Sequence, residues 1–194
     1  MKKTLTAAIL ISIVFLVTGC SKVEDKGDIT LSSASVKASV KGWNVHTNPA
    51  FRYELRYPTS WKLIDDGEKG TLVQMYSKGI KGGLDLKILG YVTYEEKYTL
   101  EEFYKTQPQD LFAEEYNYER EEVEIDGHKA MWFKNVKSYQ DGQESVLIDL
   151  VAFRFDDRIV EVEIYDEWEE SKIILNSMNF YGNNNYNIAD DQVK

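Results

Sequence analysis

The sequence predicts an α+β domain in which an antiparallel β-sheet is sandwiched between helices. Several segments alternate apolar and polar residues with the period of two that a half-buried strand requires, and Phe51 to Tyr57 is the clearest of them. Residues 146–153 are apolar on both faces apart from Asp149, which is typical of a central strand in a sheet covered on both sides. Two segments with helical spacing, 99–112 and 166–178, would supply the cover.

Turn signals separate the expected strands. Pro58 ends the first strand, at 51–57, because proline cannot donate to a strand ladder. A Gly-rich turn at 78–83 and the dipeptides Asp126-Gly127 and Asp156-Asp157 connect the remaining strands in pairs. These pairs are 71–76 with 84–92, 119–125 with 129–137, and 145–155 with 158–165.

Four acidic residues, in three of these strands, are candidates for a particular role. Asp85 is expected to point away from the apolar row of its strand, together with Lys87. Glu161 and Glu163 are expected on a solvated strand face, with a carboxylate pair for acid–base chemistry as the alternative. A buried Asp149 must be paired or shifted in pKa, and we expect it to make a structural hydrogen bond.

Capping signals mark the start of both expected helices. Thr99 and Glu102 form a capping box, and an apolar stripe follows it up to Phe112. Asp166 provides an acidic cap for the second helix. The buried face of that helix is expected to consist of Trp168, Ile174, Leu175 and Met178.

Residues 1–19 have the layout of a secretory signal peptide. Two lysines open the segment, and the 18 residues from Thr4 to Ser21 carry no charge. Val17-Thr18-Gly19-Cys20 resembles the cleavage motif of bacterial lipoproteins, in which the cysteine thiol receives a diacylglyceryl group. Cys20 is also the only cysteine of the chain. We therefore expect a lipidated Cys20 that anchors the protein on the extracytoplasmic face of a cell membrane, with an uncleaved transmembrane anchor as the alternative.

Two polar segments flank the expected domain at 46–181. Residues 20–45 contain the lipidated cysteine and a stretch rich in Ser, Ala and Lys, which predicts a flexible tether spanning about 25 Å. A short edge strand around Val36 and Val40 is the alternative for part of it. Residues 182–194 read as a polar C-terminal tail.

Composition excludes several classes of function. The net charge of −10 becomes −12 without Lys2 and Lys3, which argues against nucleic-acid binding because phosphates require clustered basic residues. One cysteine excludes a disulfide framework and Cys-rich zinc modules. The two histidines, His46 and His128, have no ligand spacing, and no Gly-x-Ser-x-Gly elbow is present. We expect no catalytic residues, no cofactor and no metal.

The segment from Phe51 to Trp61 resembles the start of the PsbP-like family. An aromatic strand ends there in Tyr57-Pro58, and Trp61 follows three residues after the proline. Residues 123–130 resemble the strand–Gly turn–strand of the family, and residues 173–180 resemble its closing helix. The resemblance covers residues 46–181.

This resemblance implies an antiparallel sheet between helices and no enzyme activity. Members of the family serve as extrinsic photosystem II subunits, related Mog-type nuclear transport factors bind a Ran-type GTPase, and many bacterial members are lipoproteins. The family's functional segments have no counterpart here that can be placed residue by residue. The resemblance therefore implies a docking module, and we expect its partner to be another envelope protein.

Two further features could form a binding site. Trp61 lines a ligand groove in one interpretation and packs over the end of the sheet in the other. The acidic turns at 65–68, 141–144 and 156–157 are candidates for calcium, although they lack EF-hand spacing and turn chemistry alone explains such residues. A calcium or small-ligand binder is therefore the alternative to a docking protein.

Overall fold

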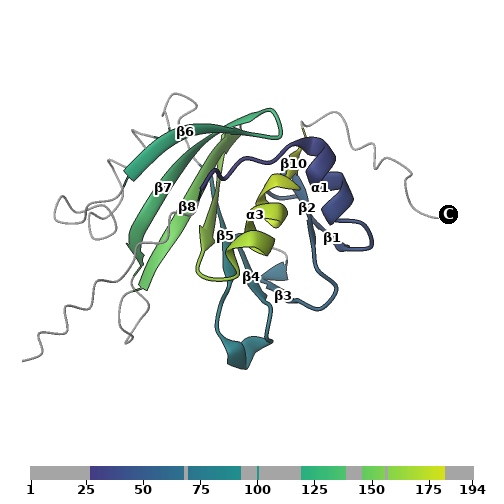
Figure 1. Cartoon of the computed structure of the whole chain (residues 1–194). Helices are drawn as coiled ribbons and strands as arrows, with labels where there is room; N and C mark the ends of the chain where they lie inside the picture. Colours follow the sequence, from purple (N-terminus) through teal and green to yellow (C-terminus); the bar gives the residue numbers. More distant parts are fainter. Residues whose placement is uncertain are drawn as a thin grey trace, which may run out of the picture.

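The structure is a computed structural model that describes residues 27–67, 70–92, 100, 119–138, 146–155 and 157–181. Within them, two antiparallel sheets and two α-helices form an α+β fold (Figure 1). The smaller sheet has the order β1-β2-β10, with bounds Asn44–Asn48, Tyr53–Tyr57 and Asn179–Phe180. The helices are α1 (Ser33–Ser39) and α3 (Trp168–Asn176), and η2 (Ile80–Gly82) is a short 3₁₀ turn.

The larger sheet has the order β3-β4-β5-β9-β8-β7-β6 within the described residues. The expected pairs of strands are confirmed as antiparallel neighbours, including the turn at Asp126-Gly127. The strand bounds in chain order are Lys62–Asp65, Leu72–Tyr76, Leu86–Val92, Glu119–Ile125, His128–Ser138, Val146–Phe155 and Arg158–Ile164 for β3 to β9.

Strand β8 is buried on both faces, as its sequence predicts. Every residue from Ile148 to Phe153 is at most 2% exposed. Because side chains alternate along a strand, Val151 and Phe153 face the main core, which α3 and the smaller sheet help to enclose. Ile148, Leu150 and Ala152 face the opposite way and form a second cluster with Phe133 and Val136.

Leu100 packs against this second cluster and is helical. The expected helix at 99–112 otherwise lies outside the described residues.

Helix α3 covers the main core with the residues that its sequence predicts. Ile174, Leu175 and Met178 are buried, and the Trp168 ring stacks on Trp132 with a centroid distance of 6.0 Å. The cap differs from expectation, since Glu167 in the left-handed region (φ 49°) is the N-cap and provides no side-chain bond. Asp166 instead accepts a hydrogen bond from the Glu167 N–H at 2.8 Å.

Residues 27–45 are part of the folded domain, so the prediction of a flexible tether is wrong for this stretch. Ile29 is fully buried in the main core, and α1 buries Val36, with Val40 buried at its C-cap. The side chain of Ser32 caps α1 by accepting the Ser35 N–H at 3.3 Å. The alternative of an edge strand at Val36 to Val40 is also wrong, because their spacing of four suits a helix.

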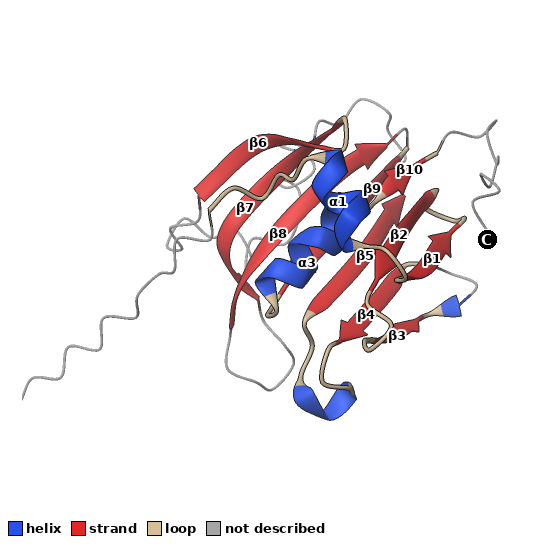
Figure 2. Cartoon of the chain, turned by 45° about the vertical axis from the view of Figure 1, so that its right-hand side comes forward, coloured by secondary structure: helices blue, strands red, loops and turns tan. Residues whose placement is uncertain are grey.

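Asn176 of α3 holds this N-terminal segment in place. Its Nδ2 donates to the Ile29 carbonyl at 2.8 Å, and its Oδ1 accepts the Leu31 N–H at 3.0 Å. Asn176 is 3% exposed, so these bonds replace water contacts that burial removes. Helices α1 and α3 therefore lie side by side over the sheets (Figure 2). Residues 1–26, with the signal motif, and residues 182–194 lie outside the described residues.

Asp149 makes the structural hydrogen bonds expected of it. It is fully buried, and its two oxygens accept from Trp132 Nε1 at 3.1 Å and from the Asn135 N–H at 3.2 Å. Asn135 lies in a bulge of β7, between Phe133 and Val136, with a φ of 57°. A bulge leaves a backbone group outside the ladder, and the carboxylate of Asp149 satisfies it.

We predict that Asp149→Leu destabilises the fold strongly, although leucine matches the apolar surroundings. The substitution removes the acceptor of the buried Trp132 Nε1–H, at a cost of about 1–3 kcal/mol, and that of the partly buried Asn135 N–H. The free energy of unfolding from urea titration measures the effect. Asn135→Gly is the matched control, because it keeps the backbone N–H and suits the positive φ, and it should stay close to wild type. A wild-type stability for Asp149→Leu would contradict this role.

Candidate functional site

The residues that the sequence singles out do not converge on one place. Val17, Thr18, Gly19 and Cys20 lie outside the described residues, so the structure does not test the lipidation motif. Trp61 is 7% exposed and belongs to the main core, which fits the interpretation that it packs over the sheet and corrects its alternative assignment as a candidate binding residue in a ligand groove. The backbone N–H of Trp61 donates to the Pro58 carbonyl at 3.0 Å, and this turn at the proline places the indole over the sheet.

The acidic turn at 65–68 is explained by turn chemistry in the residues described. Asp65 accepts the Gly67 N–H at 2.6 Å, and Asp66 accepts the N–H and hydroxyl of Thr71. These bonds lower the pKa of Asp66, the Thr71 hydroxyl contributing most. In the acidic turn at 156–157, Asp157 pairs with Arg158. The acidic turn at 141–144 lies outside the described residues.

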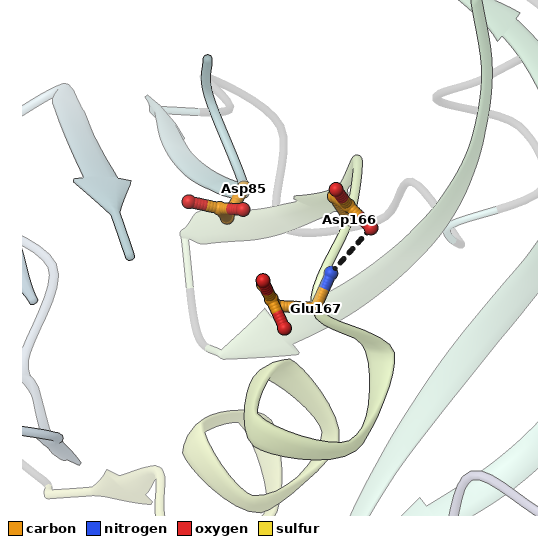
Figure 3. A group of neighbouring side chains, drawn as sticks. All are labelled: Asp85, Asp166 and Glu167. Carbon is orange, nitrogen blue, oxygen red and sulfur yellow. Dashed lines mark hydrogen bonds between the residues drawn. The ribbon is translucent and has the colours of Figure 1, made fainter. Parts of the chain in front are cut away.

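Three other carboxylates come together where β5 begins and β9 ends. Asp85, Asp166 and Glu167 place one oxygen each within 4.8 Å of one another (Figure 3). Strand pairing causes this, because Leu86 lies opposite Ile164 and the Asp85 carbonyl accepts the Tyr165 N–H at 2.8 Å. Local patterns in the sequence do not reveal this group, because Asp85 lies some 80 positions before Asp166 and Glu167 and its place outside the apolar row of its strand predicts solvation. Asp85 is in fact 4% exposed.

Protein groups already bind each of these carboxylates. Asp85 accepts the Ser77 N–H at 2.5 Å, and Asp166 accepts the Glu167 N–H. The ammonium group of Lys78 lies 2.9 Å from Glu167 Oε1, and this contact raises the pKa of Lys78. A cationic side chain therefore stands beside the acids, where a divalent ion would have to compete with it.

Glu161 and Glu163 are buried, so the prediction of a solvated strand face is wrong. They are 4% and 5% exposed. Glu163 forms an ion pair with Lys87 of β5, with Nζ to oxygen distances of 2.9 and 3.1 Å, and accepts the Tyr165 hydroxyl at 2.5 Å. Burial raises the pKa of the neighbouring Tyr91, and the charges of Glu161 and Glu163 raise it further.

The position of Lys87 explains why Glu163 is buried although the alternating pattern of its strand predicts exposure. It lies directly opposite Glu163 on the neighbouring strand, so the two charges enter the interior as a pair. The hydroxyl of Tyr165 extends the network to Ser138 Oγ, 3.3 Å away on β7. These contacts join three strands across one face of the sheet, and they give the Glu163 carboxylate a structural role.

The two histidines occupy different environments. The His46 side chain is 10% exposed, its Nδ1 lies 3.9 Å from Asp65, and its buried Nε2 has no hydrogen-bond partner among the residues that the structure describes. Burial lowers the pKa of His46, and the nearby Asp65 offsets this only in part. The His128 ring lies edge-on to Phe180 with a centroid distance of 5.1 Å.

Solved structures of other proteins are similar to this chain, a cyanobacterial and a Bacteroides protein among them. No family model and no curated protein matches the chain. The solution structure of cyanobacterial PsbP from Synechocystis sp. PCC 6803 is 14% identical, covers 71% of this chain and 92% of its own, and has a TM-score of 0.48. A crystal structure from Bacteroides thetaiotaomicron VPI-5482 is 12% identical over 73% of this chain, with a TM-score of 0.49.

This chain spans about half of the Bacteroides structure, 49% of its length. The cyanobacterial protein is a PsbP protein. Neither similarity places a binding residue on this chain. Across the described ranges, moreover, no helix is long and apolar enough to cross a membrane.

We predict that His46 makes the fold less stable in mild acid. The buried imidazole has a lowered pKa, whereas in the unfolded chain it titrates near 6.5, so the unfolded state takes up the proton first as the pH falls. The stabilising contribution of the neutral, buried His46 imidazole is complete above pH 6.5 and is lost as the pH falls from there through the lowered pKa of the folded state. His46→Phe should reduce the difference in unfolding free energy between pH 7.5 and pH 5.5, measured in urea. Thr47→Val, an exposed change on the same strand, should keep the full difference.

Proposed function

We propose that this protein is a lipoprotein, anchored through Cys20 on the extracytoplasmic face of a cell membrane, whose PsbP-like domain docks another envelope protein without catalysis. One observation carries the proposal: the only cysteine stands at the position that the motif Val17-Thr18-Gly19-Cys20 requires, after an uncharged leader. A diacyl group supplies the two chains that stable anchoring needs. The anchor also raises local concentration, so a weak contact with a membrane-bound partner suffices.

The polar interior supports a role without catalysis. Reactive groups of an enzyme must reach substrate, whereas Glu163 is paired with Lys87 and Tyr165, and Asp149 is bound by Trp132 and a backbone N–H. Both carboxylates hold strands together.

Cys20→Ala should release the protein from the membrane fraction and leave the domain folded. Removal of the thiol removes the acceptor of the lipid, while the described domain begins seven residues later, at Gly27. Fractionation with immunoblotting measures retention, and mass spectrometry of the wild type measures the lipid adduct. Ser21→Ala is the matched control and should remain in the membrane. Full membrane retention of Cys20→Ala would contradict the proposal.

A divalent-cation binder is the second candidate, and the convergence of Asp85, Asp166 and Glu167 is the observation that favours it. Calcium needs six to eight oxygen ligands, and these three carboxylates supply only part of that number. Lys78 supplies positive charge at the same place. The docking protein is therefore the better supported of the two functions.

A calcium titration of the melting temperature separates the two candidates. Under the docking proposal, we expect no shift in the wild type at millimolar calcium, because Lys78 already balances Glu167. Lys78→Met removes this competing cation and shows whether the three carboxylates can hold an ion at all. A rise in the melting temperature of the wild type, absent in Asp85→Asn, would establish the cation binder instead.

A further inference from the structure

The N-terminal segment of the domain determines how far the domain can lie from a lipid attached to Cys20. Ile29 is fully buried, and Asn176 binds the backbone on both sides of Thr30. The chain from Cys20 to Gly27 is therefore all that separates the anchor from the described fold. Seven residues reach about 25 Å when fully extended, and a random coil of that length spans about 15 Å.

The maximal distance between the anchor and the domain would be larger if the whole chain from Cys20 to the start of β1 were not packed on the domain. The 24 residues from Cys20 to Asn44 would span about 27 Å as a random coil and about 80 Å when extended. Docking of residues 27–40 therefore shortens the maximal reach about threefold, by the same estimate.

The exit point of the chain lies on one side of the domain. Asp28 accepts the Thr30 N–H at 2.8 Å, next to the backbone that Asn176 of α3 binds at Ile29 and Leu31. Figure 2 shows the loop before α1 running over the sheet toward β6 and β7. Strand β3 forms the opposite edge of the same sheet, six places from β6 and thus about 29 Å away.

We infer that the anchored domain presents its β6–β7 edge to the lipid surface and that the docked segment 27–40 holds this edge within about 25 Å of the bilayer. The inference rests on the proposed lipidation of Cys20. It assigns the β3 edge and the smaller sheet to the side that faces away from the lipid.

The charges on β6 are compatible with this orientation. The strand carries four glutamates, of which Glu121 pairs with Lys134 at 3.1 Å and Glu122 lies 3.7 Å from Lys129. Repulsion from anionic lipids acts over a Debye length of about 8 Å at physiological salt. The maximal reach of about 25 Å for seven residues allows separations that exceed that length.

Energy transfer to the bilayer tests the orientation. With Cys20 acylated, a single introduced cysteine is the only thiol available for a dye. Glu122→Cys on β6 and Lys62→Cys on β3 are matched exposed positions at opposite edges. The full lipidated protein is placed in phosphatidylethanolamine–phosphatidylglycerol vesicles with acceptor headgroups. Transfer from position 122 should exceed that from position 62 roughly twofold, given about 29 Å between the edges. Equal transfer would overturn the orientation.

Two identical insertions test the docked segment. About ten Gly/Ser residues between Lys26 and Gly27 raise the maximal reach from about 25 to about 60 Å and should reduce transfer from position 122. The same insertion between Lys41 and Gly42, an exposed turn behind the docked segment, should leave transfer unchanged. An equal reduction by both insertions would show a free tether and overturn the inference. Absence of transfer in the uninserted protein, as in Cys20→Ala, would overturn the proposed lipidation instead.

Discussion

A carboxylate in the middle of a buried strand supports much of this fold. Asp149 accepts hydrogen bonds from the Trp132 indole and from the N–H of Asn135, and both contacts fix the bulge of β7. The indole held in this way provides the surface on which Trp168 stacks. Trp168 is the first residue of α3, so a polar interaction inside the sheet determines where the covering helix begins.

The same helix connects the core to the N-terminal segment. Asn176 stands at the end of α3 and binds the backbone at Ile29 and Leu31. The order of dependence thus runs from Asp149 through Trp132 and α3 to the first described residues of the chain. Each step joins elements that are far apart in sequence. The first and the last use a buried polar side chain that is hydrogen-bonded, and the middle step is the stacking of Trp168 on Trp132.

Local patterns in the sequence predict β2 and β4 to β9, the hairpin partners among them, the doubly buried β8 and the buried face of α3, but not β1, β3 or β10. They fail where a distant residue changes the environment of a local segment. Residues 27–45 read as a linker because Ser, Ala and Lys dominate them, and only the contact with Asn176 makes Ile29 a core residue. Glu163 reads as solvated because its partner Lys87 lies on another strand. Asp85, Asp166 and Glu167 meet only through the pairing of β5 with β9.

The bond between Asn176 and Ile29 joins residues 147 positions apart. A polypeptide is synthesised from its N-terminus, so the first part of this domain to emerge has nothing to pack against until the last helix has followed. The N-terminal residues of the domain are consequently among the last to reach their native place. The segment around Ile29 becomes a core element only when folding brings the two ends of the described sequence together.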